Sequence, residues 1–437
     1  MESNAMKENN NQINRRNFLK TLGTAGIGSV LASTNASAGP NEPNIPAKTP
    51  EQKYPQVPKR KLGKTGIEVP CLSIGLMFDT VENQIVLKNA FQWGVNYWDS
   101  ASGYAGGNSE LGIGKFLSKN PDARKNLFIV SKASDAHKNP KSKQAVIDTI
   151  EERMQASLKK MNTNYIDMYC GVHGLKDPAD LNEDLRKWAE NAKKRGLIKF
   201  FGFSTHSNMA QCLAAAAKLD WIDAIMTTYN FRLAQDTPMQ DAINACNKAG
   251  IGLISMKTVA LTSQNRKQME SGGSGETASE SEKKLFTHFL QKGFTEPQAR
   301  IKAMLSDERI SSVCVGMKNV AILTSNVAAV LDKTKLTQAD MTVLHEYALA
   351  TCNGYCAGCA DICDAVLPGI PYVSDIMRYL MYYNSYGEKD MARKLFAQIP
   401  NDARSRLLTA DYTLAEARCP QRMPIASLVA EAVSKLA

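Results

Sequence analysis

The stretch "LFIVSKASDAHKNPKSKQAVIDTIEERMQASLKKMNTNYIDMYCGVH" (residues 127–173) contains one complete strand–helix–strand unit. Residues 127–132 and 165–173 are short apolar runs. Between them, residues 142–161 place apolar side chains three and four positions apart, the spacing of an amphipathic helix. A helix that crosses between two strands returns the chain to the end where it started, so the strands must lie parallel. The unit therefore predicts a parallel sheet covered by helices.

The same unit recurs along most of the chain. Eight apolar runs alternate with helical patterns: residues 71–76, 95–100, 127–132, 165–173, 200–205, 221–230, 251–257 and 311–317. Eight parallel strands with intervening helices close into a barrel with a filled interior. From about residue 336 to residue 437 the pattern becomes entirely helical. The predicted fold is α/β: a (β/α)8 TIM barrel over residues 61–335, followed by a smaller α-helical domain over residues 336–437.

The composition excludes some function classes. Of 437 residues, 43% are hydrophobic and 22% charged, which is ordinary for a globular protein. The net charge of +10 is spread over helical faces of mixed sign, without a basic block interleaved with aromatic residues. Such a distribution argues against nucleic-acid binding. The Gly/Ser-rich residues 261–284, which follow the seventh strand, predict a mobile loop at the active-site face.

The N-terminus has the features of an export signal. Arg15 and Arg16 precede a short apolar stretch, and the small residues 36–38 resemble a cleavage site, so residues 1–38 are interpreted as a removable signal peptide. It resembles the twin-arginine class, which implies export of the folded protein by the twin-arginine machinery and a periplasmic location. A basic amphipathic helix retained on the mature protein is the alternative. Residues 39–60 are proline-rich and predict a linker. No other stretch reaches 18 apolar residues, so we expect no stable membrane span.

Four polar residues lie at or just after the ends of predicted strands. Asp99, Lys132 and His173 each close an apolar run, and Tyr104 follows Asp99 by five positions. Each has an ordinary structural explanation when taken alone. Because the carboxyl ends of barrel strands meet at one mouth, we expect all four side chains to lie together there.

This combination suits carbonyl reduction. A carbonyl that accepts hydride develops negative charge on its oxygen, and a phenol is a poor acid at neutral pH unless a cation lowers its pKa. Lys132 is expected to supply that cation to Tyr104, with Asp99 holding the ammonium. His173 is expected to hydrogen-bond the substrate oxygen. The four residues are therefore predicted to be catalytic.

Several ordered motifs between about residues 58 and 335 resemble the aldo-keto reductase family. They are "RKLGKTGIEVPCLSIGLMF" (60–78), "WDSASGYAGGNSELGIGKFL" (98–117), "VSK" (130–132), "SLKKMNTNYIDMY" (157–169), "VHG" (172–174), "FFGFSTHS" (200–207) and "VGMKNVAILTSNVAAV" (315–330). The resemblance implies a nicotinamide cofactor, NADP(H) or NAD(H), that lies across the barrel mouth. It also implies a small-molecule carbonyl substrate.

The resemblance assigns cofactor contacts by position. They are Gly75, Met77, Ser204, Met256, Lys257, Gly316, Lys318 and Asn326. The chain departs from the family where Thr205, Met226 and Met256 stand in place of an asparagine, a glutamine and an aromatic residue. Lys318 is the one evident basic residue that would contact the 2′-phosphate of NADP. The sequence therefore favours NADP over NAD but does not exclude NAD.

Four cysteines crowd into "CNGYCAGCADIC" (residues 352–363), and Cys419 is followed by proline. In bacterial ferredoxin-type sites, closely spaced thiolates and a Cys-Pro pair bind an iron–sulfur cluster. The run also looks like a C-terminal extension found on one branch of aldo-keto reductases. The predicted ligands of one [4Fe-4S] cluster are Cys352, Cys356, Cys359 and Cys419, with Cys363 as the spare thiol that replaces Cys352 if the loop folds differently.

Other interpretations stay open at this stage. Four thiolates also suit tetrahedral zinc, whereas two disulfides in such tight loops are disfavoured. The leading hypothesis is an exported, NAD(P)-dependent aldo-keto reductase with an iron–sulfur domain. The alternatives are an electron-transfer protein with a retained nicotinamide and a redox partner, or a sensing module with a degenerate site.

Overall fold

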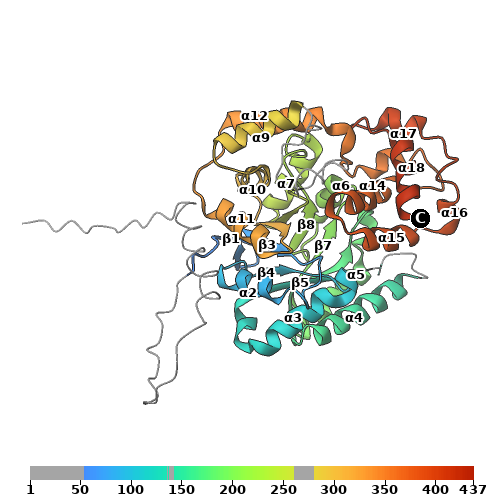
Figure 1. Cartoon of the computed structure of the whole chain (residues 1–437). Helices are drawn as coiled ribbons and strands as arrows, with labels where there is room; N and C mark the ends of the chain where they lie inside the picture. The colour runs from blue at the N-terminus through green and yellow to red at the C-terminus, as the bar shows by residue number, and fades with distance from the viewer. Residues whose placement is uncertain (1–53, 135, 137–141, 260–279) are drawn as a thin grey trace, which may run out of the picture.

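The computed structural model describes residues 54–134, 136, 142–259 and 280–437. Its centre is a closed barrel of eight parallel strands in the order β10-β3-β4-β5-β6-β7-β8-β9, shown in Figure 1. The strands are β3 (Leu72–Gly75), β4 (Tyr97–Asp99), β5 (Phe128–Lys132), β6 (Ile166–His173), β7 (Ile198–Thr205), β8 (Ala224–Thr228), β9 (Gly252–Met256) and β10 (Ser312–Gly316). The predicted (β/α)8 barrel is confirmed.

Helices surround this barrel between consecutive strands. They are α2 (Gln84–Gln92), α3 (Asn108–Lys119), α4 (Lys143–Lys160), α5 (Glu183–Lys194), α6 (Met209–Ala216), α7 (Thr237–Lys248), α9 (Glu280–Gln291), α10 (Glu296–Leu305) and α11 (Val320–Leu331). Polar side chains cap the N-termini of several of these helices. The Ser142 side chain accepts from the amide of Ala145 at the start of α4, and Thr295 with Gln298 forms a capping box on α10. Such caps satisfy amides that a helix leaves unpaired in its first turn.

An antiparallel hairpin lies across the amino ends of the strands. It consists of β1 (Lys59–Lys61) and β2 (Glu68–Pro70), and the amide of Lys64 in its turn donates to the carbonyl of Gly250 just before β9. Leu62 and Val69 join the apolar cluster that fills the barrel interior. The hairpin therefore closes one end of the barrel, and the opposite end carries the polar strand ends.

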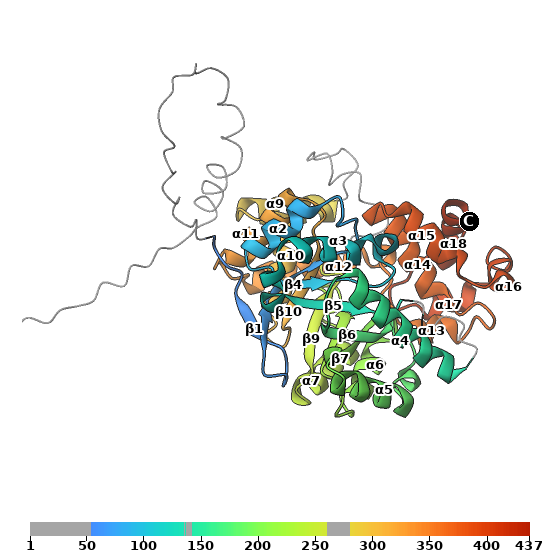
Figure 2. The ribbon, with the colours of Figure 1, turned by 90° about the horizontal axis from the view of Figure 1, so that it is seen from below.

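The C-terminal region is helical. Its helices are α12 (Gln338–Ala350), α13 (Ala360–Asp364), α14 (Val373–Met381), α15 (Lys389–Ala397), α16 (Asn401–Arg404), α17 (Thr413–Arg418) and α18 (Ile425–Leu436), with the π-helical turn η5 (Tyr382–Tyr386) after α14. From Cys363 onward these elements bury an apolar cluster of their own. In Figures 1 and 2 the helices after α12 gather on one side of the barrel. Residues 352–437 are called the C-terminal unit below.

Helix α12 lies after the expected domain boundary at residue 336, but it packs against the barrel. Leu344 and Tyr347 belong to the main core cluster, and His288 on α9 bonds Asp340 of α12 at 2.6 Å. The helix thus extends the barrel layer, and the separate apolar cluster begins at Cys363, 27 residues after residue 336.

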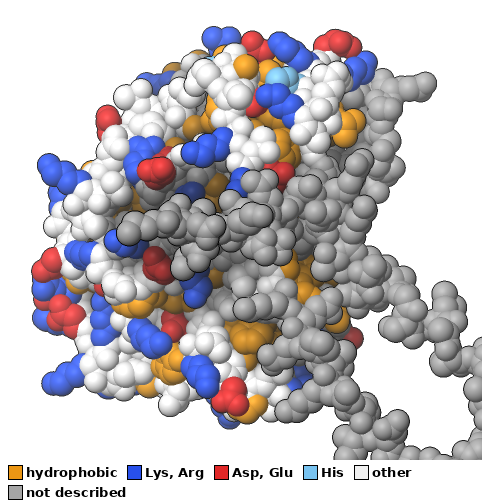
Figure 3. Space-filling view, turned by 90° about the vertical axis from the view of Figure 1, so that its left-hand side faces the viewer, with side chains coloured by type: hydrophobic (Ala, Val, Ile, Leu, Met, Phe, Trp, Pro, Cys, Tyr) orange, Lys and Arg blue, Asp and Glu red, His pale blue; other side chains and the backbone are white. Residues whose placement is uncertain are grey.

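Some expectations lie outside the described residues. The signal peptide, most of the proline-rich linker and residues 260–279 of the Gly/Ser-rich stretch belong to this group. None of the helices within the described ranges combines the length and the apolar character that a membrane crossing requires. Figure 3 shows basic and acidic side chains interspersed over one face, as the mixed-sign sequence pattern predicts.

Candidate active site

Three neighbouring strands present the predicted catalytic side chains at the barrel mouth. Asp99, Lys132 and His173 are the last residues of β4, β5 and β6, and these strands are hydrogen-bonded neighbours. Tyr104 begins a short 3-10 turn after β4, in which Ala105 has a positive φ of 49°. Parallel strands bring their carboxyl ends together, so side chains far apart in sequence meet here.

The four side chains form a series of contacts in space, from Asp99 through Lys132 and Tyr104 to His173. Lys132 Nζ donates to Asp99 Oδ1 at 2.6 Å and to the backbone oxygen of Ser100 at 2.7 Å. The same ammonium lies 4.8 Å from the ring centre of Tyr104. The Tyr104 and His173 rings meet edge to face with centres 5.7 Å apart. The structure therefore brings the predicted tetrad together.

The electrostatics of the tetrad differ from the sequence expectation. Burial raises the pKa of Tyr104 by more than Lys132 lowers it. Burial also raises the pKa of Asp99 against the opposing effect of Lys132. For Lys132, burial lowers the pKa, but Asp99 and Tyr104 together raise it by more. Lys132 is thus a firmly charged partner of Asp99. Its positive charge alone does not make Tyr104 a ready acid, because burial dominates.

Most residues assigned to the cofactor by resemblance also lie at the mouth. Gly75, Met256 and Gly316 end three strands, Ser204 is the last residue but one of β7, and Gly75 pairs with Gly316. The others have varied positions: Met77 packs against the C-terminal cluster, Lys257 follows β9, Lys318 is exposed after β10, and Asn326 is buried on α11.

The positions that depart from the family pattern are satisfied internally. The Thr205 hydroxyl donates to backbone oxygens of Leu175 and Ser207 at 2.7 and 2.8 Å. Met226 and Met256 fill the barrel interior. None of the three offers the amide or the aromatic ring that the family pattern places there.

Residues 75–348 match the model of the Aldo/keto reductase family. This chain belongs to the aldo/keto reductase family. It is 26% identical over 238 residues to an aldo-keto reductase of Alternaria alternata, covering 46% of this chain and 64% of that protein. It is 27% identical over 209 residues to an aldo-keto reductase of Schizosaccharomyces pombe whose name specifies NADP(+), covering 45% of this chain and 60% of that protein.

This chain therefore spans less than two thirds of either relative. Among solved structures, the holo form of an aldo-keto reductase from Bacillus halodurans resembles it with a TM-score of 0.52 at 20% identity, covering 67% of this chain and 96% of that one. This last similarity concerns the fold alone. The aldo/keto reductase match ends at residue 348, just before the cysteine run.

The C-terminal unit docks on the loops around the mouth of this aldo/keto reductase barrel. Four barrel loops make hydrogen bonds to it, and these include Lys176 Nζ to Asp364 Oδ2 at 2.5 Å, Ser207 Oγ to Ser374 Oγ at 3.1 Å, Asn230 Nδ2 to Tyr355 OH at 2.8 Å, and Lys257 Nζ to Tyr382 OH at 3.1 Å. In addition, Gly358 adopts a positive φ of 80° where a side chain would collide with the carbonyl of His206. The unit is thus part of the mouth.

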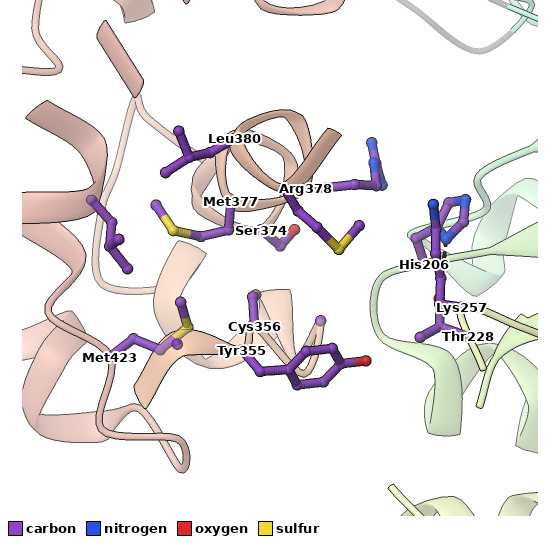
Figure 4. A pocket seen from close by; sticks show the side chains of 14 residues that line it. His206, Thr228, Lys257, Tyr355, Cys356, Ser374, Met377, Arg378, Leu380 and Met423 are labelled. Atoms are coloured by element: carbon purple, nitrogen blue, oxygen red, sulfur yellow. Dashed lines mark hydrogen bonds between the residues drawn. The ribbon is translucent and has the colours of Figure 1, made fainter. Parts of the chain in front are cut away.

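A cleft with about 600 Å³ of free space, counting its opening, separates the two parts. Figure 4 shows His206, Thr228 and Lys257 on the barrel side, with Arg378 of α14 pointing toward them. Burial, followed by nearby cations, holds the pKa of His206 well below its usual range, so the ring is neutral. The cleft residues His206, Tyr355 and Arg378 were not predicted from the sequence. The tyrosines of residues 382–386, of which Tyr382 bonds Lys257, were a sequence signal that could have indicated an aromatic surface beside the barrel.

A second cavity lies within the C-terminal unit. It has about 360 Å³ of free space, and four cysteines line it: Cys356, Cys359, Cys363 and Cys419. Cys352 does not line it and instead lies near Arg232 of the barrel. No disulfide joins any cysteine that the structure describes. Nor does any group of three or more described His, Cys, Asp or Glu side chains already converge on a metal position. The thiols surround the cavity without meeting at its centre.

Proposed function

We propose that this protein is a nicotinamide-dependent oxidoreductase that reduces an aldehyde or ketone, or oxidises the corresponding alcohol. The observation that supports this function best is the convergence of Asp99, Lys132, Tyr104 and His173 at the barrel mouth. Membership of the aldo/keto reductase family supports the same activity.

The roles follow from the geometry. Tyr104 donates its hydroxyl proton to the carbonyl oxygen, and the ring of His173 hydrogen-bonds the same oxygen. Asp99 fixes Lys132 beneath Tyr104, where the ammonium stabilises the phenolate that forms. Burial of Asp99 and Lys132 strengthens the electrostatic contact between them by excluding water.

The residues at the mouth fit a nicotinamide dinucleotide in part. Gly75 and Gly316 lie side by side without side chains, so a ligand can approach the backbone closely there. Ser204, Lys257, Lys318 and Asn326 would hold its polar groups, while Met77 and the thioether of Met256 would contact the ring. When bound, the cofactor supplies the hydride that carbonyl reduction requires.

The test has two stages. Binding is measured first, from the quenching of tryptophan fluorescence as NADPH or NADH is added. Turnover of small aldehydes is then compared between the wild type and Tyr104→Phe, which should lose about two to four orders of magnitude. Tyr169→Phe is the matched control, because the Tyr169 hydroxyl is buried without a hydrogen-bond partner. Near-normal turnover by Tyr104→Phe would rule out the tetrad as the proton source.

We also propose that the C-terminal unit binds one [4Fe-4S] cluster through Cys356, Cys359, Cys363 and Cys419. Four thiols around one cavity, with Cys419 followed by proline, support this ligand set over one that contains Cys352. Apolar residues such as Val373 and Ile425 complete the cavity wall and would shield the cluster. Zinc is the competing occupant, and metal analysis distinguishes the two.

Export by the twin-arginine route to the periplasm is the third part of the proposal. It is supported by Arg15 and Arg16 ahead of an apolar stretch, and by the need to insert a cluster before leaving the cytoplasm. Replacing both arginines by lysine should retain the protein in the cytoplasmic fraction. Unchanged periplasmic yield would exclude this route.

Electron transfer to a redox partner is a second candidate function. Cys356 and Met423 line both the thiol cavity and the cleft at the mouth, so the proposed cluster would adjoin the barrel site. In this case Cys419→Ser should abolish turnover with a dye as electron donor and preserve a single turnover with a retained nicotinamide. Sustained turnover of added NADPH by the wild type would argue against retention.

A further inference from the structure

The cleft between the barrel and the C-terminal unit has two cations on its wall. Lys257 lines it from the loop after β9, and Arg378 lines it from α14. In Figure 4, Arg378 points toward the barrel side chains His206 and Lys257. Of the described residues that line the cleft, none is an aspartate or a glutamate. The cleft therefore presents positive charge without a carboxylate of its own.

Lys257 has aromatic partners in place of a carboxylate within the described part of the chain. Its Nζ donates to Tyr382 OH at 3.1 Å and lies 4.2 Å from the ring centre of Tyr382 and 4.7 Å from that of Tyr386. Aromatic faces and a phenol compensate for part of the hydration that a half-buried ammonium loses. An ammonium has three N–H donors, and this one hydrogen bond leaves two of them for a ligand.

Arg378 shares its carboxylate with another cation. Its Nη2 lies 2.6 Å from Asp375 Oδ1, while the other oxygen of Asp375 lies 3.9 Å from Lys176 Nζ. Lys176 also pairs with Asp364 at 2.5 Å. Counting Lys257, three cations at this junction thus have two carboxylates between them. A guanidinium offers its N–H groups in a planar fork that suits two oxygens of a carboxylate or a phosphate.

The rest of the cleft wall is mainly apolar. Met377, Leu380 and Met423 line it, and Figure 4 shows these three on the side away from the barrel residues. The Arg378 side chain itself is only 19% exposed. An apolar wall holds little water, and attraction between opposite charges is stronger where water is excluded. An anion that enters this cleft is therefore bound more firmly than at an exposed arginine.

The cleft begins one strand away from the tetrad. His173 ends β6 and pairs in register with Ser204 on β7, and the cleft residue His206 follows Ser204 by two positions. Thr228 ends β8 and pairs with Met256, the residue before Lys257. Neighbouring strands lie about 4.8 Å apart, so the ends of β6 and β9 are at most about 14 Å apart. A carbon chain of moderate length spans that distance.

We propose that Lys257 and Arg378 bind a carboxylate or phosphate group of the substrate, so that the enzyme acts on anionic aldehydes or ketones. This inference rests on the proposed carbonyl reduction and names a substrate class for it. The carbonyl lies at Tyr104 and His173, and the anionic group lies between the two cations. Arg378 is thus a specificity-determining residue that the C-terminal unit adds to the barrel.

The test compares kcat/KM within pairs of aldehydes that differ in charge. Straight-chain aldehydes with a terminal carboxylate, from about four to about ten carbon atoms long to cover the span, are paired with n-alkyl aldehydes of equal length. Glyceraldehyde 3-phosphate is paired with glyceraldehyde. The anionic member of at least one pair should react about 10- to 100-fold better in the wild type, the usual contribution of a hydrogen bond to a charged group. Absence of a preference in every pair would overturn the proposal.

Substitutions assign the preference to the cleft. Arg378→Met should bring the ratio within the preferred pair close to one, and Arg378→Lys, which keeps the charge, should retain part of it. Arg393→Met is the matched control, because it removes a half-exposed arginine of the same unit that does not line the cleft. Equal losses in Arg378→Met and Arg393→Met would reflect net charge alone and overturn the subsite. If Arg378→Met does not fold, Lys257→Met provides the same comparison from the barrel side.

The cofactor is the other source of anionic groups, because the family resemblance assigns Lys257 to it. Quenching of tryptophan fluorescence measures the affinity for NADPH. If Arg378→Met loses affinity for NADPH but keeps the preference for anionic aldehydes, the cations hold a cofactor phosphate and the proposal is wrong.

A binding measurement separates this inference from the proposed activity. Octanoate carries a carboxylate but no carbonyl to reduce, and its binding is followed by calorimetry. Arg378→Met should weaken that binding about 10-fold or more. Equal binding by the wild type and Arg378→Met would refute the anion site even in an active enzyme. A wild type that binds octanoate through Arg378 but reduces no carbonyl would refute the proposed function and leave the anion site in place.

Discussion

Removing Lys132 should destabilise the protein far more than removing an ordinary surface lysine. The Lys132 and Asp99 side chains are only 1% and 4% exposed, and their charged atoms lie 2.6 Å apart. Lys132→Met leaves Asp99 buried without a cation, a change that typically costs about 3–5 kcal/mol of unfolding free energy. Lys199→Met is the matched control. Lys199 is 51% exposed, and its partner Asp167 keeps Arg124 at 2.8 Å, so the loss should stay below about 1 kcal/mol.

The cost of Lys132→Met should depend on pH with a definite sign. Burial already raises the pKa of Asp99 despite Lys132, and losing the cation raises it further. A carboxyl whose folded pKa exceeds its unfolded value of about 3.9 favours folding most at low pH. That contribution is lost as pH rises through the folded pKa. The variant should therefore be least destabilised near the acid end of its folded range and most destabilised above neutrality.

These effects are measured as unfolding free energies in urea at several pH values. The proteins compared are the wild type, the two lysine variants and the double variant Asp99→Asn/Lys132→Met. The double variant removes both charges and should recover most of the loss. The stabilising role of the buried Lys132–Asp99 pair would be refuted if Lys132→Met lowered the unfolding free energy no more than Lys199→Met. It would also be refuted if the loss did not change with pH.

Two other outcomes follow from the structure. Anaerobically purified protein should contain about four irons per chain. Cys363→Ser should lose this iron, and Cys352→Ser should keep it. Equal loss of iron in both variants, or zinc without acid-labile sulfide in the wild type, would contradict a cluster in this cavity. Gly66→Ala should cost about 1–2 kcal/mol of unfolding free energy from its positive φ alone. Gly358→Ala should lower the unfolding free energy clearly more, because its methyl group would also collide with the carbonyl oxygen of His206. Equal losses in urea unfolding would show that the backbone at His206 moves aside without a measurable free-energy penalty.

The barrel and its tetrad could be predicted from sequence because parallel strands impose a simple rule. Residues that end consecutive apolar runs meet at one mouth, so Asp99, Lys132 and His173 needed no further information. The sign of the Tyr104 pKa shift was not accessible in this way. It depends on how completely the ring is buried, and sequence spacing carries no measure of burial.

The docking of the C-terminal unit could not be predicted either. Lys257 and Tyr382 are 125 positions apart, and the amphipathic pattern of α14 shows that one face is buried without showing against what. Helix α12 illustrates the same difficulty. Its pattern resembles that of the helices that follow, but Leu344 and Tyr347 pack into the barrel layer. The choice between Cys352 and Cys363 as a ligand depends on a local feature that the sequence did not reveal, since the short turn at Cys352–Gly354 places Cys352 near Arg232.

The hairpin at the amino ends of the strands has a kinetic consequence. Leu62 and Val69 seal that end, and large side chains fill the interior, so ligands can enter and leave the site only through the mouth. The C-terminal unit is fastened to that mouth by bonds such as Lys176–Asp364 and Ser207–Ser374. Diffusion of a product back to solvent is therefore confined to the gap beside these bonds. The width of that gap therefore limits how fast a ligand can be exchanged.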